Sequence, residues 1–387
     1  MSSLVIVGGG FAGVWAAMSA AAERRRSGSA GRQLTITLVS RDSWLTIRPR
    51  LYEAHLDGLR IPLRTLFAID EVTVIEGEVT EIDTIRRAVS ITSANASRSV
   101  SYDRLVLAAG SAMPVPRIPG SDHLYSVDSF AEAERLQQHI RDLSRREARG
   151  RDSAIVVGAG FTGIEVATSL IKQLSAVSGG SRRAQVTLVD RARTLAPDLG
   201  DVARERVENA LRSLGIEWLV NTAVEQVTDA GLRVAGGRWI EAATVVWSGG
   251  FVANPLTSGL DAERDAAGRL RVDQHLRVNR LDWVYAAGDV AAAFADVANG
   301  KVAPMSCQCA IPMGHVAGHN AAADLLGTAT IDFSHHGYVT CLDLGDAGAL
   351  FMEGWSRDVK LEGFWGKQMK QYINQVLIDP RRLAAAA

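Results

Sequence analysis

Two glycine-rich turns, 150 residues apart, limit the fold of this chain more than any other feature. The first is Gly8-x-Gly10-x-x-Gly13, and the second is Gly158-x-Gly160-x-x-Gly163. Each turn follows a run of aliphatic residues and opens a stretch with helical character. The same offset relates residues 36–41 to residues 186–191. Each half is therefore predicted to consist of a strand, a glycine turn, a helix and a second strand.

This pattern predicts a dinucleotide-binding unit at each turn. The first glycine allows a tight turn, the second lets a pyrophosphate approach the backbone, and the third lets the helix pack closely on the strand. The N-terminus of the helix then faces the phosphate charge. A lone glycine motif is a weak signal, but here each copy has the strand and the helix that it needs. The sequence therefore predicts an α/β fold with two Rossmann-like units.

The first unit is predicted to be discontinuous. Residues 105–110 form an apolar run that ends in glycine, and residues 283–290 resemble it, with a short strand before a Gly-Asp turn. Such fragments on both sides of the second unit indicate that this unit is inserted into the first. The expected domains are a first domain of residues 1–114 and 251–328, a second domain of residues 115–250, and a small C-terminal domain of residues 329–387.

Composition and charge exclude several classes of protein. Hydrophobic residues make up 47% of the chain and charged residues 22%, as in ordinary globular proteins. The formal net charge of -1 gives no field that would attract nucleic acid. Three cysteines are too few for a disulfide framework and fit a reducing cytosol. No signal peptide and no apolar run of about 18 residues is apparent, so a cytoplasmic protein is expected.

Several segments resemble those of the two-dinucleotide flavoproteins, the pyridine-nucleotide disulfide reductase superfamily. The resemblance rests on residues 7–13, 51–54, 157–165, 246–250 and 287–289. Within this superfamily the chain is most similar to type II NADH dehydrogenases, which are NADH:quinone oxidoreductases. The resemblance covers nearly the whole chain, and it implies FAD in the first unit and NADH in the second.

The glycine turns and the resemblance together imply a set of cofactor contacts. The expected residues are Gly8, Gly10, Phe11, Ala12, Gly13, Ser40, Arg41, Arg48, Val79, Ala109, Gly110, Gly160, Phe161, Thr162, Gly163, Asp190, Gly249, Gly288, Asp289, Gln308 and Cys309. The resemblance implies that Asp289 contacts the ribityl chain of the flavin. A helix N-cap is the alternative role for this residue, because aspartate is a preferred cap.

The two halves differ at the end of their second strand. Asp190 stands where an acid hydrogen-bonds the ribose 2′-hydroxyl of a dinucleotide, whereas the first unit has Ser40 there. Asp42 lies two residues further on and is an alternative ribose partner. The Asp190 carboxylate would repel a 2′-phosphate, which favours NADH. Arg191 and Arg193 keep NADPH open, because guanidinium groups bind phosphate well.

Glu165 is the first of two candidate catalytic residues. It falls two residues after the last glycine of the second turn, where the first unit has Trp15. The resemblance implies a carboxylate near the nicotinamide and the flavin, which positions the cofactor or relays a proton. The alternative is an acid in the first turn of a helix, where the helix dipole stabilises it.

Gln308 is the second candidate catalytic residue. In type II NADH dehydrogenases the matching segment is an Ala-Gln-x-x-x-Gln stretch that lines the quinone pocket beside the flavin. Gln308 matches the first glutamine of that stretch, but Pro312 stands in place of the second. The change removes one amide donor from the expected site. A quinone acceptor is therefore expected, with another acceptor as the alternative.

The cysteines allow two further interpretations. Four potential metal ligands lie within a short span, namely Cys307, Cys309, His315 and His319. A Cys-x-Cys start is not the usual zinc spacing, so no metal site is expected. A redox thiol would require Cys341 to approach the earlier pair. The superfamily's thiol branches carry cysteines at the position of residues 44–51, where this chain has none.

Apolar residues at spacings of three and four between positions 361 and 377 predict an amphipathic C-terminal helix. Lys367 and Lys370 fall on the other side of this helix. The resemblance implies a helix that lies on a membrane, and the pair Phe364 and Trp365 suits such an interface. The alternatives are docking on the C-terminal domain or against a second subunit of a homodimer.

The expected activity is that of an FAD-dependent NADH oxidoreductase with a quinone acceptor. The expected location is the cytoplasm, with peripheral contact at the inner face of the cell membrane. Three other classes stay open: a soluble reductase of a biosynthetic intermediate or a protein carrier, a thiol- or sulfide-using flavoenzyme, and a non-enzymatic NADH sensor.

Overall fold

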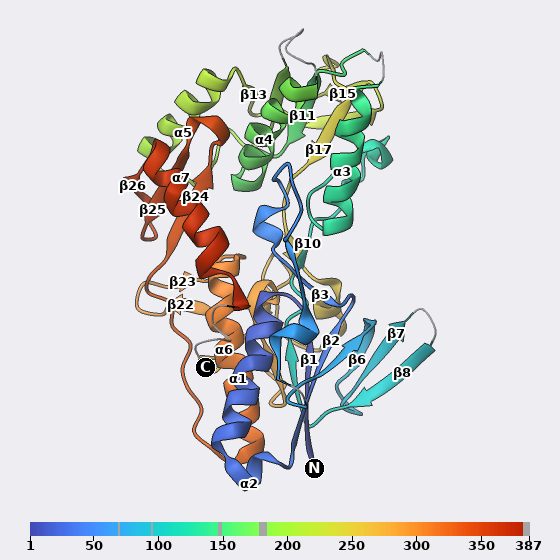
Figure 1. Ribbon diagram of the computed structural model, residues 1–387, viewed down its shortest axis with the longest axis vertical. Coiled ribbons are helices and arrows are strands. Elements are labelled where there is room, and N and C mark those ends of the chain that lie inside the picture. Colours follow the sequence, from blue (N-terminus) through green and yellow to red (C-terminus); the bar gives the residue numbers. More distant parts are fainter. Residues whose placement is uncertain (69, 94–95, 146–148, 178–183, 382–387) are drawn as a thin grey trace.

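The computed structural model describes residues 1–68, 70–93, 96–145, 149–177 and 184–381. Figure 1 shows two parallel sheets at different heights, with the C-terminal segment beside them. The mixed α/β architecture agrees with the class that the sequence predicts. Residues 382–387, the end of the predicted C-terminal domain, lie outside the described residues.

The first sheet has the strand order β20-β9-β1-β2-β5 and is parallel throughout. Its strands are β1 (Ser2–Val7), β2 (Leu34–Ser40), β5 (Thr73–Glu76), β9 (Arg104–Leu107) and β20 (Val284–Ala286). Val284 pairs with Leu105, although the two residues are far apart in the sequence. The sheet is therefore assembled from two separate segments of the chain.

The second sheet has the order β13-β12-β11-β17 and is also parallel. Its strands are β11 (Ser153–Val157), β12 (Gln185–Val189), β13 (Glu217–Leu219) and β17 (Thr244–Trp247). Leu4 pairs with Ile36 in the first sheet, and Ala154 pairs with Val186 in the second. The offset that relates the two halves of the sequence is thus preserved in the strand register.

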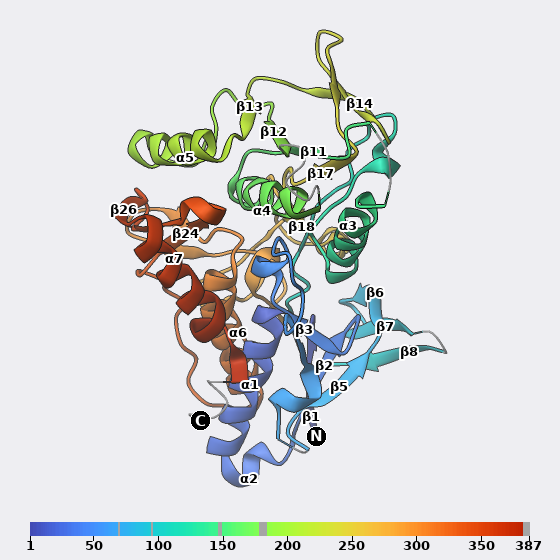
Figure 2. The same ribbon diagram turned by 45° about the horizontal axis from the view of Figure 1, so that its top comes forward.

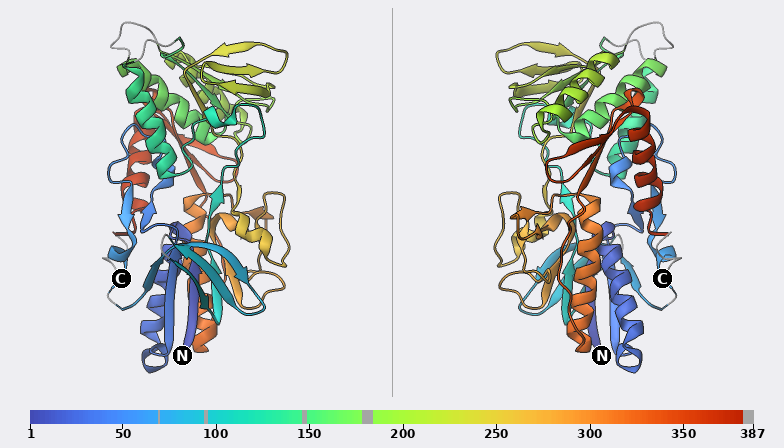
Figure 3. Two further views of the ribbon diagram at one scale, coloured as in Figure 1. Left: turned by 90° about the vertical axis from the view of Figure 1, so that its right-hand side faces the viewer. Right: turned by 90° about the vertical axis from the view of Figure 1, so that its left-hand side faces the viewer.

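Two helices from opposite ends of the first unit pack side by side (Figure 3). They are α1 (Phe11–Arg26) and α6 (Cys307–Leu326). A Cβ atom at Gly314 would lie 2.2 Å from the carbonyl oxygen of Ala12, and one at Gly318 would lie 2.0 Å from that of Ala16. Only glycine at these two positions lets the helix backbones approach so closely. This contact fixes the start of α6 next to the first glycine turn.

The remaining elements complete the two units. Antiparallel strands β10 (Ser111–Ala112) and β18 (Val252–Ala253) pair where the chain passes between the units. The other elements are α2 (Gly28–Gly31), β3 (Trp44–Thr46), β4 (Arg60–Pro62), β6 (Glu78–Asp83), β7 (Ala88–Ser93), β8 (Ala96–Ser101), α3 (Phe130–Leu143), α4 (Phe161–Val177), α5 (Asp201–Leu214), β14 (Val224–Thr228), β15 (Gly231–Val234), β16 (Trp239–Glu241), β19 (Leu270–Arg271), β21 (Ala291–Ala292), β22 (Phe294–Asp296) and β23 (Lys301–Val302).

The C-terminal segment forms an antiparallel sheet with one helix on it. The sheet consists of β24 (Val339–Asp343), β25 (Ala349–Glu353) and β26 (Asp358–Leu361), and it is followed by α7 (Gly363–Tyr372) and a π-helical turn (Ile373–Leu377). The sheet contacts α4 and α5 of the second unit, as Figure 2 shows. This segment therefore closes over the helices of the second unit.

The sides of α7 differ from what its sequence pattern suggests. Lys370 is buried against the protein, whereas Phe364 and Trp365 are 66% and 68% exposed. The lysines thus form the docked face, because buried carboxylates of the neighbouring elements attract them. All three aromatic residues of α7, Phe364, Trp365 and Tyr372, lie on the solvent face. Within the described residues, no helix is both long enough and apolar enough to cross a membrane.

Candidate functional site

A cavity of about 560 Å³ lies at the first glycine turn, at the carboxyl ends of β1, β2 and β9. In open parallel sheets such ends are where nucleotides bind. Eight of the predicted cofactor contacts line this cavity, namely Gly8, Gly10, Ser40, Arg41, Arg48, Val79, Ala109 and Gly110. Asp42, the alternative ribose partner, lines it as well.

The three glycines of the first turn have different surroundings. Gly8 has a φ of +118°, and a Cβ atom there would lie 2.2 Å from the carbonyl oxygen of Ala108. A Cβ atom at Gly13 would lie 1.7 Å from the carbonyl oxygen of Gly8. A Cβ atom at Gly10 would meet no described heavy atom within 4 Å. The backbone at Gly10 is thus open to the cavity, as close approach of a pyrophosphate requires.

A chain of polar side chains leads from the cavity toward the start of α6. Arg48 donates from Nη2 to Asp128 Oδ1 and from Nε to the Asp128 carbonyl oxygen at 3.1 Å. It also lies 3.4 Å from Ser111 Oγ, which donates to Asp289 Oδ2 at 2.6 Å. Asp289 is inside the short 3-10 helix Gly288–Val290, whose N-cap is Ala287. The alternative role of Asp289 as a helix N-cap is therefore wrong.

Other contacts predicted for the first unit lie around this chain rather than in the cavity lining. Phe11 and Ala12 are buried at the start of α1. A Cβ atom at Gly288 would lie 2.9 Å from the Cβ of Ala12. Cys309 is buried in the first turn of α6, where its backbone N–H donates to Ser306 Oγ. These residues form the packed floor beneath the Gly-Asp turn.

The second glycine turn repeats the geometry of the first. A Cβ atom at Gly163 would lie 1.7 Å from the carbonyl oxygen of Gly158, and one at Gly160 would meet no described heavy atom within 4 Å. Ser248 lies in the segment 246–250 that carries the resemblance, but it was not among the predicted contacts; its Oγ lies 3.0 Å from each of the carbonyl oxygens of Val157 and Gly158 and donates to them. Its neighbour Gly249 packs on the Trp247 ring at the same edge of the sheet.

Asp190 is held at the end of β12 by the backbone around it. Its Oδ2 accepts a hydrogen bond from the Ala159 N–H at 2.6 Å, and its Oδ1 accepts one from the Ala192 N–H at 2.7 Å. Phe161 and Thr162 begin α4 directly after this contact. Arg191 and Arg193 are exposed. The carboxylate is thus fixed beside the open Gly160, while the two arginines extend into solvent.

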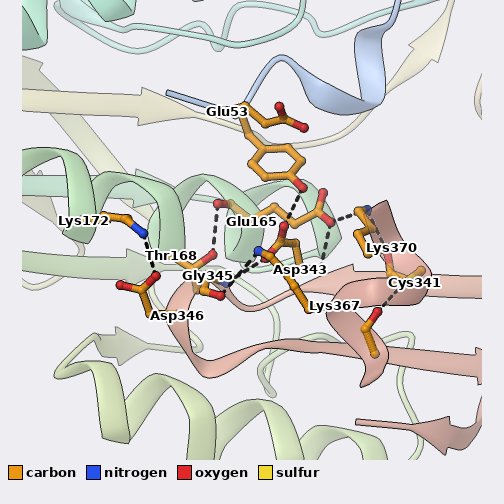
Figure 4. Close-up of polar contacts among 12 residues, drawn as sticks. Glu53, Glu165, Thr168, Lys172, Cys341, Asp343, Gly345, Asp346, Lys367 and Lys370 are labelled. Atoms are coloured by element: carbon orange, nitrogen blue, oxygen red, sulfur yellow. Dashed lines mark hydrogen bonds and ion pairs between the residues drawn. The ribbon is translucent and has the colours of Figure 1, made fainter. Parts of the chain in front are cut away.

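Glu165 is buried between the second unit and the C-terminal segment (Figure 4). Its Oε1 accepts hydrogen bonds from Lys370 Nζ at 2.7 Å and from the Asp343 N–H at 3.0 Å. Lys370 Nζ also donates to the Cys341 carbonyl oxygen at 2.9 Å. Glu165 is the fifth residue of α4 and lies beyond its first turn, so the helix-dipole alternative is wrong.

A second carboxylate extends this buried network. Asp343 accepts hydrogen bonds from Lys367 Nζ at 2.5 Å, from Tyr52 Oη at 2.9 Å and from the Gly345 N–H at 2.8 Å. Tyr52 belongs to the first unit, so its hydrogen bond to Asp343 extends the network to three parts of the molecule. Sequence reasoning missed all of these partners except the presence of two lysines on one helix side.

Burial and charge shift the titration of this network. Burial raises the pKa of Glu165, although the Lys370 charge opposes that shift. Burial is the largest single influence on Lys370 and would lower its pKa, but the charge and the hydrogen bond of Glu165, together with Cys341 and Asp343, raise the pKa overall. Burial, together with the charges of Glu165 and Asp343, raises the pKa of Tyr52 well above its usual value. The ammonium of Lys370 is therefore retained, and Tyr52 stays a neutral donor.

Gln308 and the cysteines lie at the start of α6 and on β24. The Gln308 amide donates from Nε2 to the Gly337 carbonyl oxygen at 3.2 Å, and its Oε1 accepts from the Val339 N–H at 3.4 Å. Burial raises the pKa of the Cys307 and Cys309 thiols to about 11. It raises that of Cys341 to about 12. All three are free thiols, which stay protonated near neutral pH.

His319, one of the four potential metal ligands, is occupied by other partners. Its Nε2 lies 2.9 Å from the Ala329 carbonyl oxygen, and its Nδ1 lies 3.4 Å from Glu23 Oε2. Pro312, which stands where the quinone-pocket stretch of type II NADH dehydrogenases has its second glutamine, lies on the same helix, inside α6. The described part of the chain contains no group of three or more His, Cys, Asp or Glu side chains arranged to hold a metal ion.

Comparisons with known proteins agree with this architecture. The family model described as pyridine nucleotide-disulphide oxidoreductase matches residues 2–314. An NADH dehydrogenase-like protein of Mycobacterium tuberculosis is 40% identical over 384 residues, covering 98% of this chain and 95% of that protein. A type II NADH:quinone oxidoreductase of Staphylococcus haemolyticus is 26% identical over 361 residues, covering 88% of this chain and 87% of that protein.

Among solved structures, NDH2 from Plasmodium falciparum in complex with NADH superposes with a TM-score of 0.80. The identity is 14%, with 99% of this chain and 96% of that chain covered, so the similarity concerns the fold. The resemblance that the sequence motifs predicted is thereby confirmed. The chain belongs to the pyridine nucleotide-disulphide oxidoreductase family of enzymes.

Proposed function

We propose that this protein is an FAD-dependent NADH dehydrogenase that passes electrons to a quinone. One observation carries the proposal: the chain holds two equivalent glycine cradles, each open only at its middle glycine, Gly10 and Gly160, within the described residues. FAD, when bound in the first cradle, would accept two electrons from a reduced nicotinamide and release them to the acceptor. The residues of this chain would bind and orient the two cofactors and exclude water from the site.

The first unit supplies a site with the right polarity for a flavin dinucleotide. The Gly10 backbone and the N-terminus of α1 suit a pyrophosphate. Ser111 and Asp289 form a hydrogen-bonded pair that suits the hydroxyls of a ribityl chain. Arg48 is held beside this pair by Asp128. In our proposal these residues would hold the flavin and fix its orientation in the first unit.

Asp190 supports NADH rather than NADPH as the donor. Its carboxylate is fixed by two backbone N–H groups, so it cannot swing away from a ribose without losing both bonds. A 2′-phosphate at this place would meet a second negative charge. Arg191 and Arg193 are exposed and remain the residues that would favour NADPH. Steady-state rates with the two cofactors test this preference.

Glu165 supports the coupling of the nucleotide site to the C-terminal segment. It lies one helical turn after Phe161, and the ammonium of Lys370 neutralises it in a buried position. In our proposal this pair holds the C-terminal sheet against the nucleotide site and excludes water from the region between them. The pair contributes charge and position.

The exposed face of α7 supports peripheral contact with a membrane, where quinones dissolve. Phe364, Trp365, Tyr372 and Leu377 are each at least half exposed. Aromatic side chains on a solvent face suit a lipid interface. We expect the protein to sediment with liposomes, and Phe364→Asp with Trp365→Asp to reduce the bound fraction about tenfold. Equal sedimentation of both proteins would contradict membrane contact through this face.

A soluble acceptor is the second candidate. Gln308 favours it, because its Nε2 already donates one N–H to the Gly337 carbonyl oxygen and its Oε1 already accepts from the Val339 N–H, which leaves a single N–H for a quinone carbonyl. An acceptor panel with NADH and NADPH distinguishes the candidates. We expect turnover with lipophilic quinones and NADH. Activity on soluble acceptors alone would replace the quinone, and a protein that binds neither flavin nor nucleotide would overturn the proposal.

A further inference from the structure

An arginine of the C-terminal sheet reaches the second glycine turn. Arg357 lies at the tip of the hairpin between β25 and β26, where its backbone N–H donates to the Gly354 carbonyl oxygen at 3.1 Å. Its φ is +56°, in the left-handed region that favours glycine or asparagine. Glycine or asparagine would therefore adopt this hairpin conformation with less strain than arginine. An arginine here points to a role for the side chain.

The side chain of Arg357 crosses from the C-terminal sheet to the second unit. Its guanidinium carbon lies 5.3 Å from the centre of the Phe161 ring, the residue that directly follows Gly160. Nη1 donates to the carbonyl oxygen of Asp198, in the loop that follows Asp190. Nη2 lies 3.4 Å from Tyr338 Oη. The guanidinium is thus held between the glycine turn and the loop after β12.

The contacts of Arg357 leave hydrogen-bonding capacity unused. Its Nε is buried and has no hydrogen-bond partner among the described residues. A guanidinium carries five N–H donors in a planar fork, and only two of its nitrogens have a partner here. A buried donor without a partner is uncommon and indicates a missing ligand or strain. The Phe161 ring lies against the guanidinium and restricts its movement, which reduces the entropy lost when a ligand binds.

An anion bound at the second glycine turn would complete this site. The Gly160 backbone is open, and the N-terminus of α4 carries the positive end of the helix dipole. A pyrophosphate there would place two negative charges next to Phe161. Arginine is the side chain best suited to bind phosphate through two parallel N–H groups. The geometry at the turn and the free donors of Arg357 therefore fit the same ligand.

We infer that Arg357 is a nucleotide-binding residue that the C-terminal sheet contributes to the second unit, and that it binds the pyrophosphate of the nicotinamide dinucleotide. This inference rests on the proposed function, because it places the dinucleotide at the second turn. It adds a contact outside the inserted unit. The second nucleotide site is then complete only when the β25–β26 hairpin is docked.

The test measures the affinity of the purified full-length protein for NAD⁺, ADP-ribose and adenosine. Arg357→Met removes the charge and keeps most of the length, and Arg357→Lys keeps the charge without the planar fork. Lys360→Met is the matched control, because Lys360 is an exposed cation on the neighbouring strand β26. We expect R357M to weaken NAD⁺ and ADP-ribose about tenfold or more, as for loss of a charge-assisted hydrogen bond.

The affinity for adenosine and the salt dependence of NAD⁺ binding distinguish a direct contact of Arg357 with the nucleotide from a purely structural role. Adenosine lacks the pyrophosphate, so its affinity should not change in R357M. Added salt should weaken NAD⁺ binding less in R357M than in the wild type, because one ion contact is gone. We expect R357K to fall between the two, and K360M to match the wild type.

Three results would overturn the inference. The first is NAD⁺ affinity in R357M equal to that in K360M. The second is an equal loss of adenosine and NAD⁺ affinity, because that would mean a general change of the unit. The third is an unchanged salt dependence, which indicates a structural brace. A wild-type protein that binds none of the three probes would instead contradict the proposed function itself.

Discussion

The two glycine-rich units share a backbone but use the start of their helices differently. In the first unit Phe11 and Trp15 are both buried, with ring centres 5.8 Å apart. In the second unit the equivalent residues are Phe161 and Glu165, which contact Arg357 and Lys370 of the C-terminal segment. The first helix is sealed by its own apolar side chains. The second is completed by charged groups from a distant part of the chain.

The difference suggests how one repeated framework serves two purposes. A resident flavin needs a permanent site, and the first unit offers a large cavity with a packed apolar floor. A nicotinamide dinucleotide must enter and leave in each turnover. In our account the second unit depends on the C-terminal segment for its final contacts, so its site can be linked to the docking of that segment.

The largest expected effects come from the same glycine substitution in the two units. Gly13→Ala and Gly163→Ala each place a Cβ atom 1.7 Å from a carbonyl oxygen, so the turn must shift. Such overpacking costs about 1–3 kcal/mol and deforms the cradle. We expect G13A to be purified without flavin. We expect G163A to retain flavin but to bind NADH about a hundredfold more weakly, because a cost of about 1–3 kcal/mol corresponds to a loss of affinity of up to roughly this size.

The glycine comparison has a control in the first turn. Gly10→Ala places its Cβ where no described heavy atom lies within 4 Å, so the flavin-free variant should unfold at the same temperature as the flavin-free wild type. Its flavin content should fall, because the added methyl group occupies the space that the pyrophosphate needs. Flavin absorbance and thermal unfolding measure both properties. Full flavin content in G13A, or loss of flavin in G163A, would break the distinction between the two units.

The next effect concerns the buried ion pair of the second unit. Lys370→Met leaves Glu165 buried without its cation, and breaking a buried pair costs about 3–5 kcal/mol. Urea unfolding should show this loss in K370M. Adding Glu165→Gln should recover part of it, because the remaining amide carries no charge. If K370M unfolds like the wild type, the network does not hold the C-terminal segment in place.

A smaller effect is expected at the ends of the second strands. Asp190→Ala should weaken NADH binding about tenfold, as for loss of a charge-assisted hydrogen bond, and narrow the preference over NADPH. The equivalent change in the first unit, Ser40→Ala, should alter flavin affinity less than about threefold, because a neutral hydroxyl contributes less. Titrations of both cofactors compare the two. Equal losses in the two variants would mean that the strand ends are equivalent.

The smallest effect is expected from the cysteines. Burial raises the thiol pKa of Cys307 and Cys309 to about 11, and that of Cys341 to about 12. Since the folded thiols are mostly protonated well below these values, they should react slowly with iodoacetamide between pH 7 and 9, and faster as pH rises further. Replacing each by serine should leave NADH oxidation within about threefold, a typical span for a residue outside the chemistry. Loss of turnover in any variant would revive the thiol mechanism.

The sequence was informative where local geometry determines the structure. The glycine spacing predicted both turns, and the 150-residue offset between the two halves carried over into the strand register, as the pairs Leu4–Ile36 and Ala154–Val186 show. The partners of Glu165 could not be predicted, because Lys370 lies 205 residues away and meets it only in the folded chain. A helical pattern separates the two sides of α7, but it does not say which side faces the protein. The lysine side faces the protein because the buried carboxylates of Glu165 and Asp343 attract it.

In our proposal, one chain holds a flavin in its first unit and receives electrons from NADH bound in its second. Anaerobic mixing of the purified yellow protein with one equivalent of NADH tests it directly. We predict that the flavin absorbance bleaches within seconds in the wild type, and only slowly in G163A at the same concentration. A protein that carries no flavin, or whose flavin stays oxidised, would contradict the account.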